Sequence, residues 1–187
     1  AIQGAADAFS NAGAHVTDAV PASFARAVEL WGLILNEELR VQRPLLEMVM
    51  GEDGKRFLGF ADDVYPAIDV ATLMLAFGER NAVDREWYDF LTDYDVLLMP
   101  TWTQPPFELG ADVVSVEAAQ GVLEQIRAVL PANLLGLPAA VVPVGMAGGM
   151  PVGAQLIGRR FSDLTCLNAA EVLEQAFGTI TPIDPIK

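Results

Sequence analysis

Short apolar runs alternate with longer helical patterns in the second half of the chain, and this alternation restricts the fold more than any other feature. Residues 95–99 read DVLLM, residues 139–144 read AAVVPV, and residues 152–157 read VGAQLI. Such short aliphatic runs are typical of strands covered by helices. We expect residues 95–99 to form a central strand. The glycine-rich connector 145–151 predicts a β-hairpin between the other two runs.

Apolar side chains at helical spacing predict the elements around these strands. The clearest pattern places five side chains on one stripe of a long helix: Phe24, Val28, Trp31, Leu35 and Leu39. Pro44 should end or kink this helix, and residues 51–54 should form a polar turn.

Four further helices and one brief strand complete the expected elements. One helix is expected over residues 2–12, and residues 70–90 form either two helices or one kinked helix. Ser115 can cap a helix over 116–130, and Ser162 can cap a helix over 163–177. The brief strand is expected at residues 15–17. The whole chain, 1–187, is therefore interpreted as a single segment with an α/β fold and a mixed β-sheet flanked by helices.

Charge and composition exclude several classes of partner. The chain has 11 basic and 25 acidic residues, a net charge of −14, which repels nucleic acid and anionic membrane surfaces. Charged residues interrupt the longest apolar stretch before it could span a bilayer. Cys166 is the one cysteine and His15 the one histidine, so neither a disulfide nor a tetrahedral zinc site can form within the chain. We expect no metal or cofactor, and a water-soluble protein of a reducing, cytoplasmic setting.

The residues give no complete set of groups for nucleophilic catalysis. The serines are Ser10, Ser23, Ser115 and Ser162. None of them lies in the glycine-flanked strand-to-helix turn that would expose a nucleophile. Neither Lys55, in a polar stretch, nor Lys187, the last residue, is suited to be a buried base. His15 is interpreted as a structural or surface histidine, and Cys166 as part of an apolar helix face. We therefore assign no catalytic residue.

Two other chemistries are weighed and set aside. The acidic pairs at 62–63 and 93–95 leave a two-carboxylate hydrolase open, although solvated surface positions explain them better at this net charge. The glycine-rich connector at 145–149 lacks the following helix that a phosphate-binding loop requires.

Three stretches carry a resemblance to a known family. Residues 95–101 (DVLLMPT), 131–145 (PANLLGLPAAVVPVG) and 150–174 (MPVGAQLIGRRFSDLTCLNAAEVLE) resemble, in order and spacing, the C-terminal part of the amidase signature family. Members of that family hydrolyse or transfer amides with a serine nucleophile, a second serine in a cis peptide and a lysine base, all in their N-terminal half. This chain contains no comparable Gly-Ser-rich run. The resemblance therefore implies a C-terminal piece that is inactive alone, whose partner is the missing catalytic half. A start at Ala1 instead of Met fits an excised segment.

The same resemblance implies that this piece lines the pocket for a small-molecule amide. The candidate substrate-binding residues are Thr101, Trp102, Phe107, Ile126, Leu130 and Asn133. Some members of the family carry an acidic residue near the position of Ile126 that binds the substrate amine. Its absence favours an apolar or aromatic amide. The plainer alternative is that Trp102 and Phe107 only fill a loop and that Ile126 and Leu130 are core residues.

A second function from another class stays open: a stand-alone binding or oligomerisation module that uses the same fold without chemistry. An upstream reading frame with a Gly-Ser-rich run would favour the amidase interpretation. A piece cut from a larger sheet exposes apolar surface, and at ~25 cal/mol per Å² this predicts self-association of the isolated chain.

Overall fold

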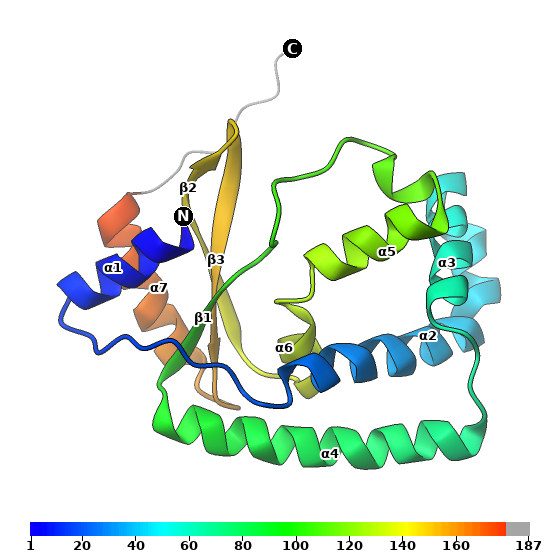
Figure 1. Cartoon of the computed structure of the whole chain (residues 1–187), viewed down its shortest axis with the longest axis horizontal. Coiled ribbons are helices and arrows are strands. Elements are labelled where there is room, and N and C mark those ends of the chain that lie inside the picture. Colours follow the sequence, from blue (N-terminus) through cyan, green and yellow to red (C-terminus); the bar gives the residue numbers. More distant parts are fainter. Residues whose placement is uncertain (179–187) are drawn as a thin grey trace.

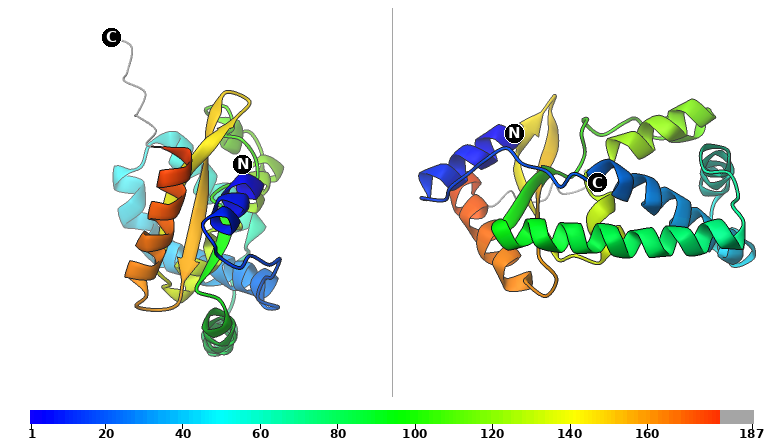
Figure 2. Two further views of the ribbon diagram at one scale, coloured as in Figure 1. Left: turned by 90° about the vertical axis from the view of Figure 1, so that its left-hand side faces the viewer. Right: turned by 60° about the horizontal axis from the view of Figure 1, so that its bottom comes forward.

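The computed structural model describes residues 1–178, which form three layers with a sheet in the middle (Figure 1). Helices α1 (Ile2–Asn11) and α7 (Asp163–Phe177) cover one face of the sheet. The remaining helices lie on the opposite side, as two further views show (Figure 2). The α/β fold expected from the alternation of short apolar runs and helical patterns is confirmed.

The sheet contains three strands within residues 1–178, in the order β1-β3-β2. They are β1 (Val96–Pro100), β2 (Ala139–Ala147) and β3 (Met150–Gly158). The predicted hairpin is confirmed as β2 and β3. All pairs in this part of the chain are antiparallel, where we expected a mixed sheet. The expectation that 95–99 is a central strand is wrong here, because β1 pairs only with β3 in the described residues.

The side chains of the sheet alternate between two cores. Ala154 and Leu156 of β3 are fully buried against α1 and α7, together with Val142 and Val144 of β2. Ile157, the next residue of β3, belongs instead to the core on the side of the long helices. Because successive side chains of a strand point to opposite faces, one strand supplies both cores.

The helical side is built on two long helices, α2 (Phe24–Val49) and α4 (Val70–Asp93), which pack against each other. The short helix α6 (Leu130–Leu135) packs on α2 and connects it to the sheet. Farther from the sheet, α3 (Glu52–Val64) packs against α5 (Val116–Gln125) and the preceding 3-10 turn η1 (Ala111–Val113). Among the helices of residues 1–178, none combines the length and apolar character that crossing a bilayer requires.

Two of the breaks expected on this side leave one continuous helix, and one predicted turn is wrong. Pro44 lies inside α2 and does not end it, and the pattern over 70–90 is one helix. The expected polar turn at 51–54 is the start of α3, where Gly51 precedes the helix and Glu52 and Asp53 lie at its positive end. Ion pairs from Arg40 and Arg43 to Asp62 join α2 to α3. Arg43 also lies 3.7 Å from Glu47, which follows the proline within α2.

The predicted strand at 15–17 is also wrong, because these residues are exposed and form neither a helix nor a strand. His15 therefore lies on the surface of the connection between α1 and α2.

Candidate functional site

An open groove of about 670 Å³ lies where the helical side meets the sheet. Its walls come from α2, from the segment between α5 and β2, and from the middle of β3. Apolar side chains make up most of the lining: Leu35, Ile126, Val129, Leu130, Ala132, Leu137 and Ala139. Trp31, Asn133 and Gln155 complete it, so none of the described residues that line the groove is ionisable.

The groove exists because the predicted helix 116–130 is broken in two. α5 ends at Gln125, and α6 begins at Leu130 with Pro131 in its first turn. A proline has no N–H to donate, and its ring clashes with the carbonyl four residues earlier, here that of Arg127, so it is tolerated at a helix start and not in a helix interior. The break places Ile126 and Val129 in a connection beside α2 instead of on one straight helix.

A hydrogen bond between α2 and α6 spans one wall of the groove. The indole Nε1 of Trp31 donates to Oδ1 of Asn133 at 2.7 Å. An indole N–H can only donate, so this bond fixes which end of the Asn133 amide faces Trp31. The amide nitrogen Nδ2 of Asn133 donates to no acceptor among residues 1–178 and, on this exposed residue, meets the solvent of the groove.

Gln155 is the buried polar residue of the groove, with 5% of its surface exposed. Its Nε2 donates to the backbone oxygen of Ala128 at 3.3 Å, which ties β3 to the break between α5 and α6. Because a carbonyl only accepts, Oε1 of Gln155 is left as the acceptor end of this amide.

The structure brings together three of the six predicted binding residues and separates the other three from them. Ile126, Leu130 and Asn133 line the groove. Leu130 is also 2% exposed, so it belongs to the core and the groove at once.

Thr101, Trp102 and Phe107 lie outside the lining. Thr101, which follows β1, donates from Oγ1 to the backbone oxygen of Gly153 at 3.3 Å. Trp102 and Phe107 pack on each other in the following loop with ring centroids 5.8 Å apart, and each is 37% exposed. Contact between this loop and a substrate stays a prediction.

Sequence reasoning misses Trp31 and Gln155 as site residues. The helical pattern puts Trp31 on the buried stripe, but the buried apolar side chains of α2 are Ala27, Leu30 and Ile34, each one position before a residue of the predicted stripe. Trp31 and Leu35 therefore lie at the edge of the helix contact and line the groove. Gln155 has one signal in the sequence, as the single polar residue of the run VGAQLI.

The groups of an amide-cleaving centre are not gathered within residues 1–178. Lys55 binds Glu52 at 2.8 Å, and this partner raises the pKa of the lysine. The hydroxyls of Ser10 and Ser162 donate to backbone oxygens, and that of Ser115 caps α5.

The other chemistries that the sequence left open gain no site in this part of the chain. Asp62 of the acidic pair 62–63 is bound to arginines, as described above. Among residues 1–178, no cluster of three or more His, Cys, Asp or Glu side chains could hold a metal ion.

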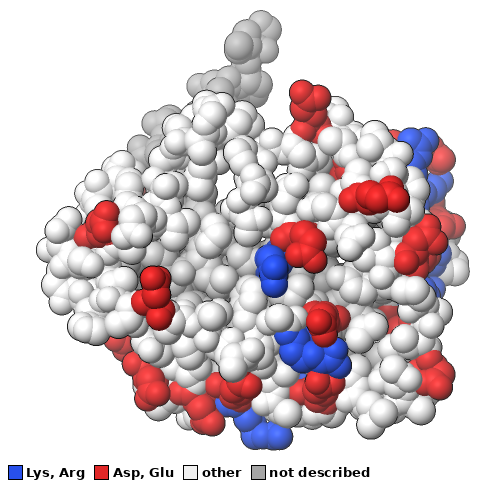
Figure 3. All heavy atoms as spheres, viewed as in Figure 1, with Lys and Arg blue, Asp and Glu red and all other residues white. Residues whose placement is uncertain are grey.

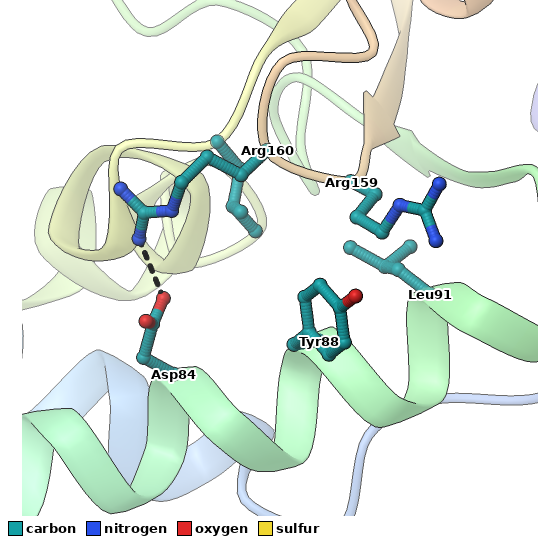
Figure 4. A pocket seen from close by; sticks show the side chains of 6 residues that line it. Asp84, Tyr88, Leu91, Arg159 and Arg160 are labelled. Carbon is teal, nitrogen blue, oxygen red and sulfur yellow. Dashed lines mark hydrogen bonds and ion pairs between the residues drawn. The ribbon is translucent and has the colours of Figure 1, made fainter.

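A second hollow, of about 20 Å³, lies between α4 and the turn after β3 (Figure 4). Arg160 binds Asp84 at 2.8 Å and the guanidinium of Arg159 lies 5.8 Å from the ring centroid of Tyr88. This space holds about one water molecule, so its side chains join α4 to the sheet and leave no room for a substrate.

Comparison with known sequences gives a consistent family. The sequence profile of the family described as Amidase matches residues 63–167. An indoleacetamide hydrolase of Bradyrhizobium japonicum is 31% identical over 182 residues, which is 96% of this chain and 39% of the relative. A glutamyl-tRNA(Gln) amidotransferase subunit of Rubrobacter xylanophilus is 39% identical over 131 residues, 64% of this chain and 27% of the relative. The chain thus spans less than half the length of these relatives.

Solved structures show the same fold. The glutamyl-tRNA(Gln) amidotransferase subunit of Thermotoga maritima superposes with a TM-score of 0.73 at 24% identity, covering 95% of this chain and 38% of that one. An allophanate hydrolase of Kluyveromyces lactis gives a TM-score of 0.74 at 22% identity, covering 94% of this chain and 29% of that one.

Proposed function

The chain belongs to the amidase family, and on that premise we propose that it forms the substrate-binding wall of a larger amide hydrolase. The nucleophile and the base of that enzyme lie in sequence that precedes this chain. The observation that carries the proposal is the groove: it is concave, mostly apolar and has a few fixed polar groups, as ligand sites usually do. No serine–lysine pair accompanies it within the described residues.

The substrate class that we propose is a linear, apolar or aromatic amide. Ile126 lines the groove where the family resemblance would place an acidic residue that binds an amine. A groove without ionisable side chains among its described residues offers no partner for a charged substrate, and a charge removed from water without a partner is strongly unfavourable. One relative that matches nearly the whole chain is described as acting on indoleacetamide, which fits this class.

Exposed apolar side chains support the idea that further protein covers this chain. Val41, Leu45, Met48 and Val49 share one face of α2 and are 65–84% exposed. The remainder of the larger protein, or a second copy of the isolated chain, would bury this face. We expect the isolated chain to self-associate at micromolar concentration in sedimentation experiments, and a strictly monomeric species would count against this view.

A reducing, cytoplasmic location is the setting that we propose. Cys166 is buried, and its thiol contacts the backbone oxygen of Pro138 at 3.6 Å. Acidic side chains are more widely spread than basic ones over the face shown in Figure 3.

The decisive experiment compares the isolated chain with the protein encoded by the complete gene on a panel of primary and aryl amides. We expect turnover by the complete protein and none above buffer by the isolated chain. Turnover by the isolated chain that a change of Ser10, Ser23, Ser115 or Ser162 abolishes would overturn the proposal. Failure of the complete protein to hydrolyse any amide would do the same.

A further inference from the structure

We propose that Trp31 is a positioning residue that fixes Asn133 as a hydrogen-bond donor, and that this pair makes the groove select neutral amides over charged compounds of the same shape. The inference rests on the proposed function and names the residues that set its specificity. It starts from two observations: the hydrogen bond between α2 and α6, and a groove lining without ionisable side chains among the described residues.

The first step is the orientation of the Asn133 amide. An asparagine can present either its oxygen or its nitrogen, and free rotation would let it serve donors and acceptors equally. The Trp31 indole occupies Oδ1 at 2.7 Å. The bond holds Oδ1 on the side of Trp31 and leaves Nδ2, which is a donor, as the end that has no partner among residues 1–178, so Asn133 suits a carbonyl oxygen better than an ammonium group.

The second step is the fixed acceptor on the other wall. The Nε2 of Gln155 is held by Ala128, and Oε1 is its acceptor end. Nδ2 of Asn133 and Oε1 of Gln155 are thus one donor and one acceptor on residues that line the groove. An amide group has the complementary set, a carbonyl that accepts and an N–H that donates.

The third step is the lack of charge. Leu130, Ala132 and Gln155 are 2–6% exposed, so closely packed residues form the floor of the groove. Arg127 follows Ile126 in sequence, but its guanidinium lies 5.7 Å from the Phe24 ring centroid and 3.6 Å from Glu124. Its side chain is not part of the lining. A ligand with a carboxylate or an ammonium would lose its hydration without a partner.

The test uses three ligands of one shape: phenylacetamide is neutral, phenylacetate is an anion and 2-phenylethylammonium is a cation. The full chain contains three tryptophans, and in ¹⁵N-labelled protein their indole N–H signals report on three places. Trp31 lies in the groove, Trp87 is fully buried, and Trp102 lies in the exposed loop. Loss of one signal in Trp31→Phe assigns Trp31, and slow deuterium exchange separates Trp87 from Trp102.

We expect phenylacetamide to shift the indole signal of Trp31 and the side-chain NH2 signals of Asn133 while Trp87 stays unchanged. The two charged compounds should bind roughly tenfold more weakly or not at all. Equal binding of all three would overturn the inference. A shift at Trp102 without one at Trp31 would also overturn it, because the ligand would then lie against the loop.

Asn133→Asp is the sharpest variant, because the carboxylate can still accept from Trp31 and only the donor Nδ2 is replaced. We expect phenylacetamide to bind roughly tenfold more weakly and 2-phenylethylammonium to become the preferred ligand. Asn168→Asp adds the same charge at an exposed position of α7 and is the matched control. It should leave the preference for phenylacetamide intact. An unchanged preference in Asn133→Asp would contradict the inference.

Trp31→Phe tests the positioning role separately. The phenyl ring keeps most of the apolar wall but cannot donate, so Asn133 becomes free to turn. We expect the ratio of the affinities for phenylacetamide and 2-phenylethylammonium to become smaller. The side-chain NH2 signals of Asn133 should change as well. If Trp31 has only a structural role, the Trp31→Phe variant should bind all three ligands more weakly by the same factor and keep the preference for phenylacetamide. That result would overturn the proposal that Trp31 positions Asn133.

Failure of this inference and failure of the proposed function give different results. If the complete protein hydrolyses amides while the ligand preference ignores Asn133 and Trp31, only the inference is lost. If no ligand shifts any of the three indole signals, the groove is not the amide site, and turnover by the complete protein then decides the proposed function.

Discussion

The two faces of the sheet differ in how far they are covered. On the face toward α1 and α7, Ala154 and Leu156 of β3 are 0% exposed and Val144 of β2 is 2% exposed. On the face toward the long helices, Ile157 is buried, but Val141 of β2 is 56% exposed and Gln155 lines the open groove. One face is a closed core that holds the chain together, and the other is a core at one end and an open groove at the other.

The difference follows from which elements are available to each face. α7 runs along β2 and β3 directly after the hairpin, so it closes its face with contacts that are short in sequence. The opposite face depends on α6, which directly precedes β2, and on α2, which is distant in sequence, and these two helices leave part of the face open. A change on the closed face should therefore affect folding, and a change on the open face should affect ligand binding.

The largest expected effect is the loss of Leu156 from the closed face. Leu156→Ala leaves a cavity beside Val142 and Leu173, and we expect the free energy of unfolding to fall by about 2 to 5 kcal/mol. Val141→Ala on the open face removes a side chain that is already half exposed and should cost less than about 1 kcal/mol. Urea unfolding of both variants measures this difference. Equal losses of unfolding free energy would show that the two faces do not differ in how much they stabilise the fold.

A smaller effect is expected from adding a methyl group to each face in turn. A Cβ at Gly158 would lie 2.5 Å from Oγ of Ser162 and 2.6 Å from Sγ of Cys166, both next to or on the closely packed α7. We expect Gly158→Ala to destabilise the fold by roughly 1 to 3 kcal/mol.

The matched change on the open face is Gly153→Ala. Its Cβ would meet Thr101 Oγ1 at 3.0 Å and Val141 Cγ1 at 3.2 Å, and the exposed Val141 has room to move. We expect a smaller loss of stability than for Gly158→Ala in the same thermal unfolding experiment. A larger loss at Gly153 would mean that the open face is as tightly packed as the closed one.

The smallest expected effect is a pH dependence of the closed face. Burial, with a lesser contribution from the Asp163 carboxylate, raises the pKa of the Cys166 thiol. A thiol whose pKa is raised on folding stabilises the fold fully below the pKa of the unfolded chain, and this contribution is lost as the pH rises through the folded value. Stability should therefore decline above about pH 9.

The Cys166→Ala variant isolates this contribution from other groups that titrate in the same range. Its free energy of unfolding should decline less steeply between about pH 8 and 10 than that of the unsubstituted chain. Urea titrations of the two proteins in parallel measure this difference. Identical slopes would show that Cys166 does not contribute. In the unmodified chain, alkylation by iodoacetamide at about pH 8 should require unfolding, because Cys166 is 2% exposed.

Local patterns are sufficient for the strands and most helices. The hairpin, the α5 cap at Ser115 and the helix after Ser162 depend on residues that are neighbours in sequence, and each is present. That α2 continues through Pro44 is not predictable in this way, because a proline within a helical pattern indicates either an end or a kink of the helix. The predicted strand at 15–17 is wrong because β-branched residues without a pairing partner do not form a strand.

The candidate site is only partly predictable for the same reason. Ile126, Leu130 and Asn133 lie within eight residues of one another, and their association follows from one helical segment and its proline. Trp31 and Asn133 are 102 residues apart, so their contact depends on how α2 packs on α6.

The amino-acid sequence by itself determined the α/β class, the hairpin, the acidic surface and the lack of a recognisable nucleophile, because each depends on composition or on short-range periodicity. Only the tertiary structure decided that β3 lies between β1 and β2, that the helix after Ser115 breaks to form a groove, and that Trp31 orients Asn133. These features arise from contacts between distant segments, whose geometry is fixed when the two faces of the sheet are covered.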